Sequence, residues 1–62
     1  MNNKIRIGIV DDKAINRNTI GGKIKQFEEL ELCFSAVNGK DCLDQLKGLP
    51  LEKLPQVIFM DI

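Results

Sequence analysis

The sequence contains no histidine, only two cysteines and no excess of charge of either sign. Without histidine, Cys33 and Cys42 fit no common metal-binding motif, and we interpret both as reduced thiols that fill space. Nine basic and nine acidic side chains cancel, which argues against a nucleic-acid or anionic-membrane surface for the chain as a whole. Cysteine-based metal centres and nucleic-acid binding are therefore not expected.

Long hydrophobic runs are also missing. The N-terminal MNNKIRIGIV carries Arg6 in its middle and runs into two aspartates, whereas a signal peptide needs an uninterrupted apolar segment. The longest apolar runs are too short to span a bilayer. We therefore expect no membrane partner and a cytoplasmic location.

The pattern of apolar residues predicts five short elements. Strands are predicted where isoleucine, valine and other apolar residues cluster, and helices where apolar residues recur every three to four positions. The strands are 4–10, 30–37 and 56–62, and the helices are 14–27 and about 40–47. Pro50 and Pro55 predict an irregular link before the last strand.

Strands that alternate with helices imply an α/β fold. The crossovers should be right-handed, which gives a parallel sheet with helices on both faces. Such a sheet is covered on both sides, and this explains why IGIV and VIFM are continuously apolar. With 62 residues there is at most one domain, and its hydrophobic core is small. The sequence shows no disulfide pattern or metal motif that would stabilise such a core.

Two of the predicted strands carry aspartates at or directly after their carboxyl ends. Asp11 and Asp12 follow the first strand, and Asp61 comes near the end of the third. Parallel strands end at the same edge of a sheet, so these carboxylates would share one cleft if the strands are neighbours. They remain ionised together only if a cation or a basic side chain joins them. Mg²⁺ suits such hard oxygen ligands. The plainer alternative is that these polar residues only mark strand ends.

The segments IGIVDD, AVNGKDCLDQL and PQVIFMDI resemble the first, second and third strand motifs of receiver domains of two-component response regulators. They agree with that family in order and spacing, and the resemblance covers all 62 residues. It implies a flavodoxin-like three-layer sandwich with strand order 2-1-3 in this part of the sheet. It also implies that residues 1–62 are the N-terminal portion of a receiver, without its fourth and fifth strands and later helices.

The resemblance also assigns roles to the three aspartates. Asp61 falls on the phospho-accepting position, and Asp11 and Asp12 fall on the acidic pair that binds Mg²⁺ directly or through water. Asp61 is then both the nucleophile and a metal ligand. A carboxylate attacks a phosphohistidine usefully only when Mg²⁺ neutralises the phosphoryl oxygens. We therefore expect a phosphoacceptor that takes part in its own phosphorylation and is not a turnover enzyme.

Two positions depart from the family pattern without touching this chemistry. Lys13 replaces a polar or acidic residue that often follows the acidic pair, and Gln56 replaces an aspartate that often follows the proline. The link 48–55 also looks longer than usual. The family's other groups are a backbone carbonyl at position 63, a hydroxyl ending strand four and a lysine ending strand five, and we expect all of these beyond residue 62.

The resemblance implies a sensor histidine kinase or phosphotransfer protein as donor, and an output domain or partner beyond residue 62. The basic residues of the first helix could steer that donor, although a solvated helix face would have the same composition. These residues are Lys13, Arg17, Lys23 and Lys25.

Two other functions compete with phosphotransfer. The chain could be a binding or assembly module that self-associates through the bare edge of its third strand. A nucleotide-binding enzyme is a weak third alternative, because DDKAIN after the first strand has no glycine-rich loop to hold a phosphate.

Overall fold

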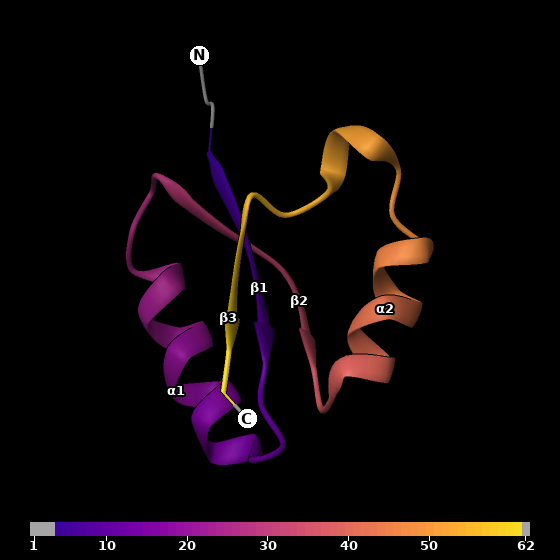
Figure 1. Cartoon of the computed structure of the whole chain (residues 1–62). Coiled ribbons are helices and arrows are strands. Elements are labelled where there is room, and N and C mark those ends of the chain that lie inside the picture. Colours follow the sequence, from indigo (N-terminus) through magenta and orange to yellow (C-terminus); the bar gives the residue numbers. More distant parts are fainter. Residues whose placement is uncertain (1–3, 62) are drawn as a thin grey trace.

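The computed structural model describes residues 4–61 as a three-stranded parallel sheet between two helices. The elements are β1 (Ile5–Val10), α1 (Ala14–Lys25), β2 (Leu30–Ala36), α2 (Gly39–Lys47), the 3₁₀ helix η1 (Leu51–Lys53) and β3 (Val57–Met60). The strand order is β2-β1-β3, and α1 and α2 lie on opposite sides of the sheet (Figure 1). The predicted fold class is therefore confirmed. The domain range 1–62 stays a prediction, and residues 1–3 and 62 lie outside the described part.

The element boundaries differ from the prediction at the ends. The first helix stops at Lys25, because the amides of Gln26 and Phe27 bond to carbonyls three residues back and tighten the last turn. The prediction of an irregular link was wrong for Leu51–Lys53, where a 3₁₀ turn needs only the amides of Lys53 and Leu54. Neither α1 nor α2 in the described part is long and apolar enough to cross a membrane.

The sheet buries a small cluster of side chains on each face. On the α1 side the buried residues are Ile7, Ile9 and Ile24, with Ile20, Leu30 and Leu32 packed against them. On the α2 side they are Val10, Phe34, Ala36 and Cys42, with Cys33, Leu46 and Leu49 around them. Both cysteines are free thiols, as expected. β1 therefore lies at the centre of both clusters, which explains its uninterrupted apolar sequence.

The apolar pattern of α1 is only partly used for packing. Ile20 and Ile24 contact the sheet, but Ile15 is 72% exposed. Ile15 comes five residues before Ile20, which is about 140° around a helix with 3.6 residues per turn. The predicted apolar first turn is therefore not part of the core.

Gly8 makes room for an aromatic ring in the centre of the sheet. A Cβ built at Gly8 would lie 2.6 Å from Cζ of Phe34, which is far closer than real side chains approach. The pairing of β1 with β2 also shifts between Ile7 and Gly8, so that Cys33 is passed over in the register. Gly8 is thus a packing requirement of β1.

We expect Gly8→Ala to lower the free energy of unfolding by about 1–3 kcal/mol, because the added methyl forces the buried Phe34 ring out of its position. Gly22→Ala is the matched control. A Cβ at Gly22 meets nothing within 4 Å, and alanine favours the helix by about 0.5–1 kcal/mol. Urea unfolding of both variants measures these changes. Equal stability of Gly8→Ala and the parent chain would contradict this packing.

Candidate functional site

The carboxyl ends of β1 and β3 lie side by side at one edge of the sheet. Val10 pairs with Met60 in the parallel register, so the next residue on each strand is an aspartate. The Asp61 amide donates to the Val10 carbonyl at 3.0 Å, and the Asp11 amide donates to the Ala36 carbonyl at 3.0 Å. The sheet hydrogen bonding thus continues one residue past the strands and fixes the backbone of both aspartates.

Asp11 is held by the loop that leads into α1. Its side chain is buried, with 2% of the residue exposed, and its Oδ1 accepts from the Lys13 amide at 2.9 Å. The Arg17 guanidinium donates through Nη1 to the Asp11 carbonyl at 2.8 Å. The carboxylate of Asp11 therefore has a donor in the N-cap residue of α1, and its carbonyl has a donor in the first turn of that helix.

These contacts favour the ionised form of Asp11. The Lys13 amide lowers the pKa of the Asp11 carboxyl below its ordinary value of 3.8, burial opposes this shift, and the side chains of Asn16, Asp12 and Asp61 lower the pKa further. Asp11 is therefore a carboxylate at neutral pH. Because the folded-state pKa is lowered, its contribution to stability is present above the ordinary pKa and is lost as the pH falls through the folded-state value.

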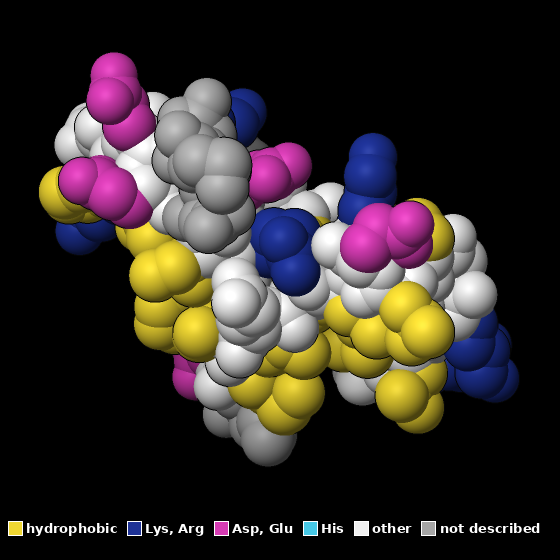
Figure 2. All heavy atoms as spheres, turned by 90° about the horizontal axis from the view of Figure 1, so that it is seen from above, with side chains coloured by type: hydrophobic (Ala, Val, Ile, Leu, Met, Phe, Trp, Pro, Cys, Tyr) yellow, Lys and Arg dark blue, Asp and Glu magenta, His cyan; other side chains and the backbone are white. Residues whose placement is uncertain are grey.

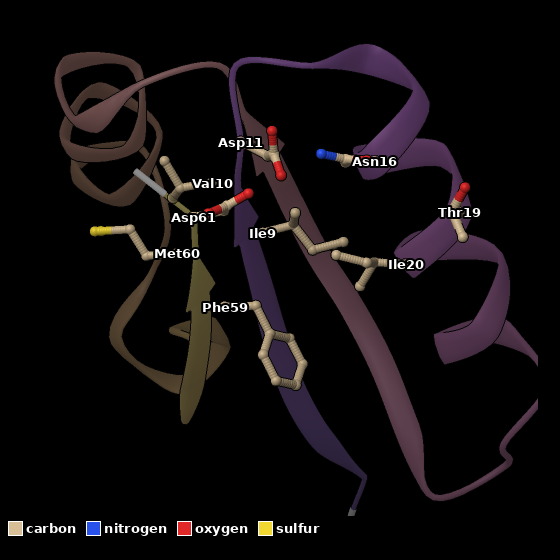
Figure 3. A pocket seen from close by; sticks show the side chains of 9 residues that line it. All are labelled: Ile9, Val10, Asp11, Asn16, Thr19, Ile20, Phe59, Met60 and Asp61. Atoms are coloured by element: carbon tan, nitrogen blue, oxygen red, sulfur yellow. The ribbon is translucent and has the colours of Figure 1, made fainter.

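Two cavities open at this edge of the sheet, and Asp61 lines both. The first, on the α1 side, has a volume of about 380 Å³ and contains Asp11 and Asp61 at its polar end (Figure 3). Its other lining residues are Ile9, Val10, Asn16, Thr19, Ile20, Phe59 and Met60. The second, of about 320 Å³, is lined by Asp12 and Asp61 together with Val10, Val37, Asn38, Gly39 and Met60. Asp11 and Asp12 therefore face different cavities.

The donor chemistry of this edge fits Mg²⁺. Asp11 is an ionised carboxylate beside Asp61 in one cavity, and Mg²⁺ commonly takes one or two carboxylates while it keeps several waters. Between residues 4 and 61, however, no group of three acidic, cysteine or histidine side chains is arranged to hold a metal ion. The three-aspartate ligand set thus stays a prediction, with Asp11 and Asp61 as the pair that shares a cavity.

Sequence reasoning missed two polar residues of the first cavity. Asn16 and Thr19 lie on α1, and with Ile20 they follow the three- and four-residue spacing that puts side chains on one helix face. The signal was present, because Asn16 is an uncharged polar residue one turn after the acidic pair. It was not decisive, because the apolar pattern alone did not show which face of α1 turns toward the aspartates.

The chain is similar in sequence to a segment of several protein-glutamate methylesterases/protein-glutamine glutaminases. It is 37% identical over 57 residues to protein-glutamate methylesterase/protein-glutamine glutaminase 1 of Syntrophomonas wolfei, covering 92% of this chain and 15% of the relative. The corresponding enzyme of Clostridium acetobutylicum is 34% identical over 59 residues, covering 95% of this chain and 16% of the relative. That of Methanococcus maripaludis is 36% identical over 59 residues, covering 95% and 15%.

No protein-family model matches the chain, and no solved structure matches it. The chain spans about 15% of the length of the curated relatives that it matches. The similarity therefore concerns one segment of those enzymes. Together with the parallel sheet of order 2-1-3, it supports a receiver-like segment.

Proposed function

We propose that this chain provides the phosphoacceptor part of a receiver. Asp61 accepts a phosphoryl group from a sensor histidine kinase or phosphotransfer protein, Mg²⁺ is bound by Asp11, Asp12 and Asp61, and the modified chain regulates an output domain or partner. The observation that supports this best is the placement of Asp61 at the end of β3, in the same cavity as the buried, ionised Asp11.

The proposed transfer needs one nucleophile and one leaving group. A carboxylate oxygen of Asp61 attacks phosphorus, an O–P bond forms, and the P–N bond of the donor's phosphohistidine breaks with its electron pair going to the imidazole nitrogen. Asp61 is exposed and can meet a donor, whereas Asp11 is buried and can act only from within the cavity. Bound Mg²⁺ would neutralise charge on the transferred phosphoryl oxygens.

The donor is proposed to approach near α1. Lys13, Lys23 and Lys25 are exposed there and could attract an acidic partner surface. Arg17 is half-buried and is engaged with the Asp11 carbonyl, so it contributes less to a docking surface than its place in the sequence suggested. For the output, we propose first the activity named for the relatives, which is protein-glutamate methylesterase and protein-glutamine glutaminase activity.

Labelling by a small phosphodonor tests this proposal. We expect the protein, purified as its gene encodes it, to be labelled by acetyl phosphate when Mg²⁺ is present and not after chelation. Asp12→Ala should slow labelling by about 10-fold or more through weaker Mg²⁺ binding. Asp44→Ala removes an exposed carboxylate from α2 instead and should label normally. Labelling that is independent of Mg²⁺ would contradict the proposed metal site.

An assembly function is the second candidate, because β3 is exposed along its whole length. Val57, Ile58, Phe59 and Met60 are 41%, 37%, 48% and 52% exposed. Figure 2 shows hydrophobic side chains in adjoining patches along the lower side of that view. In this alternative the β3 edge pairs with a second copy of the chain, and no phosphoryl group is transferred.

A further inference from the structure

The polar end of the first cavity includes one uncharged donor from α1. Asn16 is half-buried, and in Figure 3 its side chain points from α1 toward the Asp11 carboxylate. Thr19, one turn further along α1, also lines the cavity, but its hydroxyl donates to the Ile15 carbonyl at 2.8 Å. Among the α1 side chains that line this cavity, Asn16 is therefore the one whose amide group can donate a hydrogen bond to the aspartates.

Asp11 has one oxygen fixed and needs a second contact to be fully oriented. The Lys13 amide donates to Oδ1, and the Asp11 side chain lines the same cavity as Asn16 and Asp61. A carboxylate held at one oxygen can still turn about its Cβ–Cγ bond. A second donor would stop this rotation and direct the remaining lone pairs toward a cation. The lowered pKa of Asp11, to which the Asn16 side chain contributes, agrees with such a contact.

We propose that Asn16 is a positioning residue for Asp11, whose side-chain amide orients the carboxylate for Mg²⁺ binding next to Asp61. This inference rests on the proposed receiver function and adds one residue to its site. Asn16 acts through Asp11 and does not itself take part in phosphoryl transfer. Groups that orient metal ligands commonly change metal affinity by about 10–100-fold when they are removed.

The test compares Asn16→Leu with Asn18→Leu in the protein purified as its gene encodes it. Leucine has a similar size without a donor, and Asn18 is an exposed residue of α1 that does not line the cavity. Mg²⁺ titration followed by the backbone amide signal of Asp11 gives the affinity directly. We expect about 10-fold weaker binding in Asn16→Leu, wild-type affinity in Asn18→Leu, and unchanged urea midpoints without Mg²⁺ for both. Saturating Mg²⁺ should restore the labelling rate of Asn16→Leu.

The outcomes separate this inference from the function on which it rests. Wild-type protein that labels on Asp61, together with equal Mg²⁺ affinity of wild type and Asn16→Leu, overturns the positioning role alone. Slow labelling of Asn16→Leu that persists at saturating Mg²⁺ also overturns it, because the residue would then act on the phosphoryl group. Wild-type protein that neither binds Mg²⁺ nor labels overturns the proposed function, and the inference with it.

Discussion

Replacing Asp61 by asparagine is expected to abolish phosphoryl labelling by acetyl phosphate. The amide has nearly the same shape as the carboxylate but is a far weaker nucleophile, and it lacks the charge that would attract Mg²⁺. The fold should persist, because the contact that fixes this position joins the Asp61 amide to the Val10 carbonyl and does not use the side chain. Intact mass spectrometry after incubation with acetyl phosphate and Mg²⁺ measures the loss.

Asp44→Asn is the matched control for this substitution. Asp44 is an exposed aspartate on α2, where it pairs with Lys40 at 3.4 Å, and the same chemical change there should leave labelling intact. Circular dichroism should give the same spectrum for both variants. Equal labelling of wild type and Asp61→Asn would place the nucleophile elsewhere, and peptide mapping would then identify the modified residue.

The elements of the fold could be predicted from the sequence because their signals are local. Runs such as IGIV and VIFM identified two strands, and the start of α2 is also marked locally, because the side chain of the N-cap Asn38 accepts from the Asp41 amide at 2.8 Å. The strand order did not follow from these patterns and came from the resemblance to receivers. Strand order depends on contacts between segments that are far apart in the sequence, which local periodicity does not contain.

The contacts between elements were less predictable. Gln56 departs from the receiver pattern outside the phosphotransfer chemistry, yet its side-chain oxygen accepts from the Arg6 amide at 3.1 Å and its own amide donates to the Arg6 carbonyl at 2.8 Å. Arg6 also donates through Nε to the Leu54 carbonyl at 2.8 Å. This pairing aligns the start of β3 with β1. Nothing in the spacing of residues 6 and 56 indicates such a contact.

The candidate site was also only partly predictable from the sequence. That aspartates follow both β1 and β3 could be seen in the sequence, and their common edge follows from parallel pairing. The sequence does not show that Asp11 and Asp12 line different cavities, because this depends on how the backbone turns after Val10. The inward contact of Arg17 also depends on that turn, so the sequence alone does not distinguish Arg17 from the exposed lysines near it.

The exposed edge of β3 has a register in which it can pair with a second copy. An antiparallel pair with its two-fold axis at Ile58 sets Ile58 opposite its own copy, Val57 opposite Phe59 and Gln56 opposite Met60. No two like charges face each other in that register. The outward-facing amides and carbonyls of β3 would be satisfied, and its four half-exposed apolar side chains would gain cross-strand neighbours.

A polypeptide of these 62 residues alone is therefore expected to self-associate through β3 and to be a poor phosphoacceptor. It has the three carboxylates but not the carbonyl, hydroxyl and lysine that the receiver resemblance implies, so repulsion among the aspartates is only partly relieved by a weakly held cation. Ile58→Lys should give a monomer, because the two ammonium groups would lie directly opposite each other at the two-fold axis. Ile15→Lys makes the same change at a 72% exposed position on α1 and should still associate. Sedimentation and acetyl phosphate labelling of mass-verified samples measure both properties, and a compact monomer that labels stoichiometrically on Asp61 would contradict the expectation.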